Sequence, residues 1–321
     1  MTDGCGVRYD DVLLGVVEVM ATDYKQIEWD EKVADDCRQL IRLAVREDLD
    51  RSFDLTSVAL FASDATGSAK VVARQDGLIA GLPAVELVLA EMDTRTRLVS
   101  AAEDGEAIVA GQSVATIEGA TRDILTSERI ILNFLGRLSG IATLTRRYVE
   151  AVANEKANIY DTRKTTPGWR RLEKYAVRCG GGRNHRTGLF DAVLIKDNHL
   201  ASEVSPAVAV CRAREFLAEQ FPDADGERPL VEIEVDSLSQ LSAVLPPGPD
   251  VILLDNMTPD ELRRAVAIRD ASPSSVELEA SGGVNLQTVG EIAKTGIERI
   301  SVGGVTHSAV ALDFGLDWKL S

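Results

Sequence analysis

Sulfur, aromatic and imidazole side chains are scarce in this 321-residue chain. It contains four cysteines, three histidines and only 5% aromatic residues, although 45% of its residues are hydrophobic. The cysteines are far apart and show no paired metal-ligand spacing, which argues against a disulfide framework and against structural zinc. A core poor in aromatics must be built from Val, Leu, Ile and Ala, which suits buried parallel strands and their covering helices. We therefore expect an α/β fold.

Positive charge is also in short supply. The chain has 35 Lys and Arg against 51 Asp and Glu, a formal net charge of -16. Such a chain repels nucleic acid and anionic membranes, so we expect neither as a partner, and an anionic ligand requires a local basic site. The short run "VLLGVVEVM" is interrupted by Glu18, so we expect no signal peptide, no membrane span and a cytoplasmic protein.

The first half of the chain predicts a small mixed unit. Residues 1–29 show no clear period, so we expect an extension there with little chemistry. Asp30 is a candidate N-cap for an amphipathic helix, and short strand-like runs follow, with a helix at "PAVELVLAEM". A long helical pattern then covers about 121–152, and we expect a break near Gly136 or Gly140.

After Asn158 the pattern changes to alternating apolar strands and helices. The strand runs are "NIYD", "AVLIK", "LVEIEV", "VILLD", "VELEAS" and "RISVGG". Repeated strand–helix units predict a parallel sheet, and in an α/β barrel the carboxyl ends of the strands carry the chemistry. Polar, charged or glycine residues close these runs, and they are the first candidate site residues: Asp161, Lys196, Glu234, Asp255, Ser281, Gly303 and Gly304.

One stretch contradicts the acidic balance of the chain. Residues 161–188 hold eight Lys or Arg and only two acids. Arg163 and Lys164 can serve two anions, Arg as a planar clamp and Lys as a point charge, and the triplet Gly180 to Gly182 brings flexible backbone next to His185 and Arg186. For each of the three histidines taken singly, a structural hydrogen bond remains the expected role. On the intervening helix we expect solvated side chains at Arg170, Arg171, Lys174 and Arg178.

Two carboxylates and two glycine pairs complete the candidate site. Glu234 and Asp255 close consecutive strands, where an unpaired carboxylate is costly, so each should meet a cation, a metal or a sugar hydroxyl. With a phosphorylated ligand, Mg²⁺ is the usual bridge; the alternative is a structural ion pair with Lys196 or Arg186. "ASGGVN" and "SVGGVTHS" each place two glycines after a strand, where free backbone N–H groups favour a phosphate.

Taken in order, these motifs resemble one enzyme family. "SERIILNFLGRLSGIAT", "DTRKTTPG", "RCGGGRNHR", "DAVLIKDNH", "VEIEVDS", "ILLDNM", "EASGGVN" and "ISVGGVTHS" are similar to the motifs of nicotinate-nucleotide pyrophosphorylase (carboxylating), the quinolinate phosphoribosyltransferase family. The resemblance spans about Leu40 to Leu316. It implies conversion of quinolinate and phosphoribosyl pyrophosphate to nicotinate mononucleotide, pyrophosphate and CO₂ with Mg²⁺, in de novo NAD synthesis.

The resemblance also implies an architecture and residue roles. It implies the type II phosphoribosyltransferase fold, with a sandwich domain at 30–138, joined by 307–321, and an open α/β barrel at 139–306 that carries catalysis. It implies a homodimer or higher homo-oligomer with shared active sites. Quinolinate would be bound by Arg163, His185, Arg186, Lys196 and the partner's Arg129. Thr162 and Lys164 would lie near the phosphoribosyl donor, and Glu234 and Asp255 would hold its ribose and Mg²⁺. The catalytic residues would be Lys164, Lys196, Glu234 and Asp255. The 5′-phosphate would lie against Ser281, Gly282, Gly283, Val302, Gly303 and Gly304.

The sequence is also compatible with two other functions. A related phosphoribosyltransferase acting on nicotinate or another small acid would need fewer cations for a single carboxylate. A non-catalytic sensor of a phosphorylated metabolite would need the basic groups and glycines but not both Glu234 and Asp255. The sequence departs from the family pattern in three places. Asp54 and Thr56 lack the usual neighbouring glycines, which concerns the local turn more than the chemistry. Trp169 replaces a smaller apolar residue and the leading extension is longer than usual, and either could alter the entrance or the subunit contact.

Overall fold

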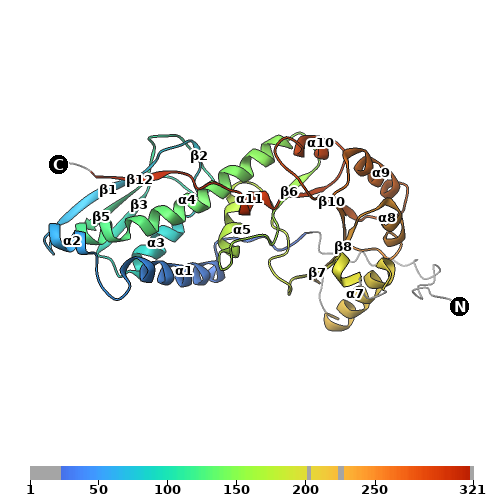
Figure 1. Cartoon of the computed structure of the whole chain (residues 1–321), viewed down its shortest axis with the longest axis horizontal. Helices are drawn as coiled ribbons and strands as arrows, with labels where there is room; N and C mark the ends of the chain where they lie inside the picture. The colour runs from blue at the N-terminus through green and yellow to red at the C-terminus, as the bar shows by residue number, and fades with distance from the viewer. Residues whose placement is uncertain (1–22, 201–203, 223–227, 319–321) are drawn as a thin grey trace. The chain divides into compact units, whose positions relative to one another are not determined.

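The computed structural model describes residues 23–200, 204–222 and 228–318. Its chain forms two compact units, each with its own sheet. The parallel-sheet unit contains the described residues of 1–25, 151–160 and 185–302, and the antiparallel-sheet unit contains those of 26–150, 161–184 and 303–321. Figure 1 labels most of their helices and strands. No helix in the described ranges is both long and apolar enough to cross a membrane.

The antiparallel-sheet unit is built around four strands in the order β12-β1-β5-β3. β1 is flanked by β5 and by β12, which comes from the far end of the chain, and both pairings are antiparallel. A separate pair, β2 with β4, completes its strands. The strand bounds are Thr66–Ala73 (β1), Gly77–Leu78 (β2), Thr96–Ser100 (β3), Ala107–Ile108 (β4), Ser113–Ala120 (β5) and Phe314–Trp318 (β12).

The first helix forms as its sequence predicts. α1 (Glu31–Leu49) begins after Asp30, whose carboxylate accepts hydrogen bonds from the N–H groups of Lys32 and Val33. Its buried face includes Val33, Cys37 and Ile41, so the predicted amphipathic helix is confirmed. The other helices of this unit are α2 (Leu55–Leu60), α3 (Leu82–Glu91), α4 (Thr121–Ala151, whose last residue falls in the parallel-sheet unit), α5 (Arg170–Cys179) and α11 (Gly304–His307).

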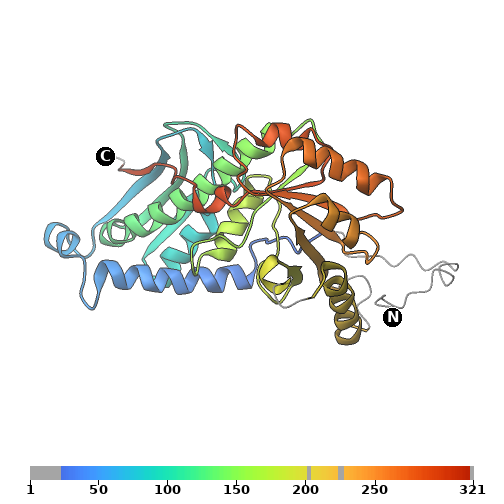
Figure 2. The same cartoon turned by 45° about the vertical axis from the view of Figure 1, so that its right-hand side comes forward.

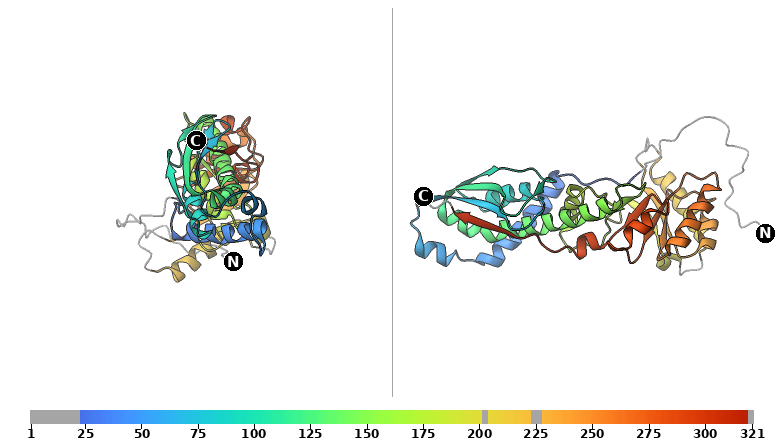
Figure 3. Two further views of the ribbon diagram at one scale, coloured as in Figure 1. Left: turned by 90° about the vertical axis from the view of Figure 1, so that its left-hand side faces the viewer. Right: turned by 90° about the horizontal axis from the view of Figure 1, so that it is seen from above.

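The expected break in the long helix is wrong. α4 runs without interruption for 31 residues and is the long green helix of Figures 1 and 3. Its glycines serve close packing instead. A Cβ added at Gly140 would lie 2.1 Å from the Val310 carbonyl oxygen, and one at Gly136 would lie 2.9 Å from that of Leu312. The segment at 310–312 can approach the helix this closely only because those two positions lack side chains.

The parallel-sheet unit carries the predicted series of strands. Its six strands run parallel in the order β6-β11-β10-β9-β8-β7 and form the open α/β barrel, so the expected α/β class is confirmed. The strands are Asn158–Tyr160 (β6), Ala192–Ile195 (β7), Leu230–Val235 (β8), Val251–Asp255 (β9), Glu277–Ser281 (β10) and Arg299–Ser301 (β11). Most of their residues are buried Val, Ile, Leu and Ala, as a sheet covered on both faces requires.

Helices connect these strands. They are α6 (Asp197–Leu200), α7 (Pro206–Gln220), α8 (Leu238–Val244), α9 (Pro259–Asp270) and α10 (Val289–Ala293). α9 begins at Thr258 with a capping box in which Thr258 and Glu261 satisfy each other's backbone N–H groups. Figure 2 shows α8 and α9 beside the strands that they connect. This arrangement places the carboxyl ends of β7, β8, β9 and β10 along one edge of the sheet.

Candidate active site

Four predicted site residues lie at the carboxyl edge of the parallel sheet. Lys196 follows β7, Glu234 lies near the end of β8, Asp255 ends β9 and Ser281 ends β10, and these strands are consecutive neighbours in the sheet. Lys196 and Glu234 form an ion pair in which the lysine side chain is 43% exposed and the glutamate 15%. The structural ion pair with Lys196, which was the alternative to Mg²⁺ for Glu234, is therefore present. It leaves the lysine side chain about half-exposed to solvent.

The ends of β9 and β10 are joined by a tight backbone contact. The N–H of Asn256 donates to the Ser281 carbonyl at 2.9 Å, and the Asn256 side chain donates to the Asp255 carboxylate at 2.7 Å. Gly282 has a left-handed φ of +95°, and a Cβ there would lie 2.2 Å from Asn256 Oδ1. Only glycine fits this position, so the first glycine of "SGG" is explained by local packing. Gly283, also left-handed, has no atom within 4 Å of its would-be Cβ.

The three histidines each bond to a neighbouring group, as expected. His199 Nδ1 accepts the N–H of Lys196 at 2.8 Å, and His307 Nδ1 lies 2.7 Å from the Ser308 hydroxyl. His185 Nδ1 accepts the N–H of Arg186 at 2.8 Å. His185 and Arg186 are both nearly buried, and the Arg186 guanidinium donates to the Ala192 carbonyl at 3.3 Å. The last two contacts fix the start of the segment that leads into β7.

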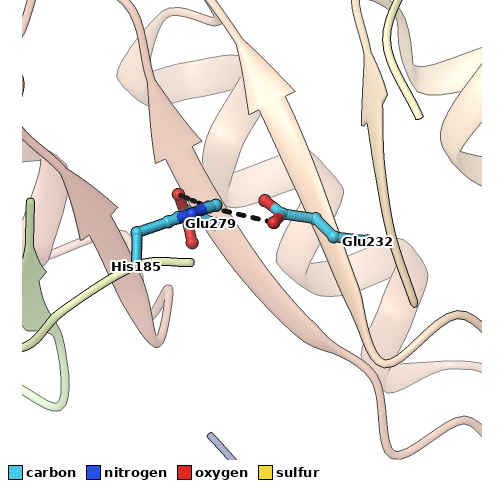
Figure 4. Close-up of side chains that lie close together, drawn as sticks. All are labelled: His185, Glu232 and Glu279. Carbon is cyan, nitrogen blue, oxygen red and sulfur yellow. Dashed lines mark ion pairs between the residues drawn. The ribbon is translucent and has the colours of Figure 1, made fainter. Parts of the chain in front are cut away.

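A buried cluster lies inside the parallel sheet. His185 Nε2 is 3.0 Å from a Glu232 carboxylate oxygen and 3.7 Å from one of Glu279, and the three side chains point toward one another in Figure 4. Both carboxylates are fully buried. Burial, together with the neighbouring Glu232 charge, raises the pKa of Glu279 to about 7. Tyr24 also donates its hydroxyl to Glu232 and stacks on the His185 ring.

The residue types in this cluster are those of a metal site, but its side chains are joined to one another by hydrogen bonds. The ligand atoms of His185, Glu232 and Glu279 all lie within 4.8 Å of one another, a set that a transition metal accepts. Because His185 Nδ1 accepts a backbone N–H, the ring proton is on Nε2, which faces Glu232. One Glu232 oxygen therefore already accepts donors from both His185 and Tyr24.

In the antiparallel-sheet unit, the basic loop lies against the start of α11. Thr162 Oγ1 accepts the Lys164 N–H at 3.0 Å, and the Thr306 hydroxyl donates to the Lys164 carbonyl at 3.0 Å. A Cβ at Gly303 would lie 3.2 Å from Lys164 Cδ and from His307 Nε2. The structure thus brings Thr162, Lys164 and Gly303 together, and the Lys164 side chain is exposed.

The remaining predicted cations of that unit lie in different settings. Arg163 is half-buried, and its Nε is buried without a hydrogen-bond partner among the residues that the structure describes, which suits capture of an anion. Arg129 is exposed on α4. Arg137, which the sequence did not single out, pairs with buried Glu173 at 2.6 Å and donates to the Thr306 carbonyl at 2.9 Å. It ties α4 to α5 and to α11.

Two interpretations of the basic stretch are wrong. Gly180 to Gly182 end α5: Gly181 is left-handed with φ +85°, and the Gly182 N–H donates to the Val177 carbonyl at 3.0 Å, so the triplet is a helix C-terminus. Lys174 is not solvated. Its side chain is fully buried in an ion pair with Asp161, which also accepts from Asn184 at 2.7 Å. Asp161 is therefore a buried structural partner and not an open strand-end ligand.

The two family departures have local explanations. Asp54 is the N-cap of α2, where it accepts the Ser57 N–H at 3.0 Å and the Thr126 hydroxyl at 3.2 Å, so the turn is held without glycine. Hydrogen bonds from Ser57 hold the pKa of Asp54 below its usual value. Trp169 stacks on Phe134 with ring centroids 4.8 Å apart, so its large ring is accommodated by packing against α4.

A lysine, two carboxylates and a glycine turn at the carboxyl edge of the parallel sheet are the arrangement expected of an α/β-barrel enzyme. Residues 54–139 match the model of the quinolinate phosphoribosyl transferase N-terminal domain, and residues 141–317 match that of the C-terminal domain. The chain belongs to the quinolinate phosphoribosyl transferase family. It is a pentosyltransferase, and the resemblance of its motifs to that family is confirmed.

Known proteins of this family are similar to the chain over most of its length. A nicotinate-nucleotide pyrophosphorylase [carboxylating] of Mycobacterium leprae is 44% identical over 285 residues, covering 88% of this chain and 97% of that protein. A quinolinate phosphoribosyltransferase [decarboxylating] of Nicotiana tabacum is 36% identical and covers 88% of this chain and 82% of that protein. The solved nicotinate-nucleotide pyrophosphorylase of Francisella tularensis superposes with a TM-score of 0.82 at 33% identity, covering 92% of this chain and all of that one.

Proposed function

We propose that this protein catalyses the transfer of a phosphoribosyl group from phosphoribosyl pyrophosphate to quinolinate, with loss of CO₂, in de novo NAD synthesis. The observation that carries the proposal is the match of both family domains in a chain whose Lys196, Glu234, Asp255 and Ser281 close neighbouring strands. The products are nicotinate mononucleotide, pyrophosphate and CO₂.

Cationic side chains bind quinolinate in this proposal. The substrate carries two adjacent carboxylates, and Arg offers each a planar pair of donors while Lys offers a point charge. Arg163 and Arg186 are the principal clamps, Lys196 a further cation, and His185 a fourth member of the set. The partner's Arg129 completes it. The buried Nε of Arg163, without a partner among the described residues, and the half-exposed Lys196 support an anionic ligand.

The phosphoribosyl donor is held by a second group of residues. Thr162 and Lys164 lie near its pyrophosphate, and the 5′-phosphate contacts Ser281, Gly282, Gly283, Val302, Gly303 and Gly304. Glu234 and Asp255 hold the ribose hydroxyls. Carboxylate oxygens at neighbouring strand ends also suit Mg²⁺, a hard cation that prefers oxygen ligands, so the same two residues would hold the ion directly or through water. When bound with the donor, Mg²⁺ would neutralise charge on the departing pyrophosphate.

The chemistry balances without an enzyme nucleophile. The bond from ribose C1 to the pyrophosphate oxygen breaks, and the quinolinate nitrogen forms the new bond to C1. Lys164 and Lys196 offset the charge of the leaving group, and the Glu234 and Asp255 carboxylates stabilise the oxocarbenium-like sugar. The pyridinium then accepts the electron pair of the C2–carboxylate bond as CO₂ leaves, and C2 takes up a proton. The 3-carboxylate stays bound throughout.

A homodimer with shared active sites and a cytoplasmic location belong to the same proposal. Five apolar side chains around α2 are between 38% and 72% exposed: Phe53, Leu55, Val58, Leu60 and Phe61. Exposed apolar clusters mark interaction surfaces, which supports association of two copies. The acidic composition and few cysteines support the cytoplasm.

One assay tests the reaction. Purified protein is incubated with Mg²⁺, phosphoribosyl pyrophosphate and either quinolinate or nicotinate, and CO₂ and pyrophosphate are measured together. We expect equal amounts of both products with quinolinate and neither with nicotinate. Pyrophosphate without CO₂, or turnover of nicotinate alone, would show a related phosphoribosyltransferase, and no turnover with binding of phosphorylated ligands would show a sensor.

A further inference from the structure

Tyr24 belongs to a segment in which the sequence indicated little chemistry, yet it is 5% exposed and lies within the parallel-sheet unit. Its ring packs with Tyr160, Ala192 and Leu230. Ala192 and Leu230 are the first residues of β7 and β8. The ring therefore packs among residues at the amino ends of these two strands.

The hydroxyl of Tyr24 contacts Glu232, a carboxylate on the same strand as the predicted catalytic Glu234. It donates to Glu232, and Glu232 lies two residues before Glu234 on β8, so both side chains point to the same face of the sheet. Glu279 and Ser281 have the same relation on β10. Glu232 and Glu279, which both face His185, thus each lie two residues before a predicted site residue on the same strand.

Three contacts fix the His185 ring beside Glu232 and Glu279. The Arg186 N–H donates to Nδ1 at 2.8 Å, Nε2 lies 3.0 Å from Glu232, and the Tyr24 ring stacks on the imidazole with centroids 4.4 Å apart. Because Nδ1 is an acceptor, Nε2 carries the ring proton and is the hydrogen-bond donor to Glu232. Both ring nitrogens are therefore occupied by protein groups.

The residue beside Tyr24 pairs with a buried cation of the same unit. Asp23 is 3.2 Å from the guanidinium of Arg299, whose side chain is 2% exposed, and Arg299 also pairs with Glu277 at 2.5 Å. That guanidinium lies over the rings of Tyr24 and Tyr160 at 5.5 and 4.9 Å. Residues 23 and 24 thus supply one acid for a buried cation and one hydroxyl for a buried carboxylate, which makes them part of the interior of the sheet unit.

We propose that Tyr24 is a positioning residue: it holds Glu232 and the His185 ring in place, so that His185 orients Arg186 for a substrate carboxylate and does not bind that carboxylate with its own ring nitrogens. This inference rests on the proposed quinolinate reaction for its consequence in catalysis. It replaces direct binding of quinolinate by His185 with an indirect role through Arg186, and it assigns a role to Tyr24.

The test compares Tyr24→Phe, which keeps the stacked ring but removes the hydroxyl, with Tyr24→Leu, which removes both. We expect the KM for quinolinate to rise about fivefold in Tyr24→Phe, the effect of one hydrogen bond, and further in Tyr24→Leu. The KM for phosphoribosyl pyrophosphate should stay unchanged. Tyr175→Phe is the matched control, because Tyr175 donates to the Asp104 carboxylate at 2.8 Å in the antiparallel-sheet unit, and it should leave both KM values unchanged.

A second readout does not depend on turnover. The chain has three histidines, so imidazole ¹H–¹⁵N spectra give three separable sets of signals. We expect wild-type His185 as the neutral tautomer with the proton on Nε2, shifted in Tyr24→Phe while His199 and His307 are unmoved. Quinolinate should leave that tautomer in place.

Three results would overturn the proposal: unchanged His185 signals in both Tyr24 variants, an unchanged KM for quinolinate in a folded Tyr24→Leu protein, or about one equivalent of a transition metal retained through His185. The last would make Nε2 a ligand and not a donor. If the wild-type protein does not consume quinolinate, the proposed function fails, and the imidazole spectra still decide whether Tyr24 fixes the ring.

Discussion

At the scale of single residues, burial changes what a charged side chain does. Lys174 belongs to a run of basic residues that resembles a solvated helix face, yet its ammonium is fully buried beside Asp161. Arg171, on the same helix, pairs with Asp36 at 2.7 Å and keeps 30% of its side chain exposed. A buried charge whose partner is removed is costly, whereas a half-exposed pair contributes little.

Replacing Lys174 by Met should therefore destabilise the protein. The Asp161 carboxylate would stay buried without its cation, and we expect the free energy of unfolding to fall by about 3 to 5 kcal/mol in urea denaturation. Lys70→Met, at an exposed position of β1, should change it by less than about 0.5 kcal/mol. Adding Asp161→Asn to Lys174→Met should recover part of the loss; a double variant as unstable as the single one would contradict the ion-pair explanation.

Glu279 gives the protein a stability that depends on pH. Its pKa is raised from 4.5 to about 7 by burial and by Glu232, so between these values the folded state binds more protons than the unfolded state. The free energy of unfolding therefore falls as pH rises from 4.5 to 7. In Glu279→Gln this contribution is absent, and the stability of the variant relative to wild type should increase across that range and level off above it. Urea titrations at several pH values measure the difference, and a constant difference would contradict the assignment.

At the scale of elements, glycines have two different effects on helices. In the middle of α4, Gly136 and Gly140 are compatible with a continuous helix because the neighbouring segment at 310–312 occupies the space of their missing side chains. At the end of α5, Gly181 adopts a left-handed φ and stops the helix. The same residue type predicts a break in both cases, and only the neighbouring atoms distinguish them.

Gly140→Ala should therefore destabilise the protein, although alanine is normally the better helix residue. The added methyl group would lie 2.1 Å from the Val310 carbonyl, and overpacking of this kind costs about 1 to 3 kcal/mol. Gly290→Ala in α10 is the matched control. Its Cβ would have its nearest contact at 3.7 Å, so we expect unchanged or slightly higher stability, up to about 1 kcal/mol. Equal effects of the two substitutions on thermal unfolding would exclude the packing explanation for α4.

At the scale of the whole molecule, the negative charge of -16 coexists with a proposed set of cations for a doubly anionic substrate. The proposal divides that set between two copies, since Arg129 would act in the partner's site and Arg186 in its own. The exposed side chains around α2 offer a surface for such an association.

Hybrid dimers test this division. Arg129→Ala and Arg186→Ala should each abolish most activity alone. After mixing and exchange, random pairing makes half of the dimers hybrids with one intact site each, so we expect about a quarter of wild-type activity. Because the two variants have the same mass, one of them is uniformly ¹⁵N-labelled, and native mass spectrometry then confirms that hybrids have formed. Hybrids without activity would count against sites shared between subunits, and each variant mixed with itself is the control.

Much of this protein follows from the sequence because the deciding interactions are local or periodic. The apolar runs of β6 to β11, the Asp30 cap of α1 and the polar residues that end consecutive strands were predictable, and parallel pairing then brings Lys196, Glu234, Asp255 and Ser281 to one edge. Only the tertiary structure decided the partners across long separations. Tyr24 meets Glu232 across 208 residues, and Gly140 meets Val310, which is likewise distant in the sequence. The sequence analysis missed Glu232, although its spacing from Glu234 places both side chains on one face of a strand. Nothing near Tyr24 or Lys174 in the sequence shows that they are buried, because burial depends on which distant segments cover a side chain.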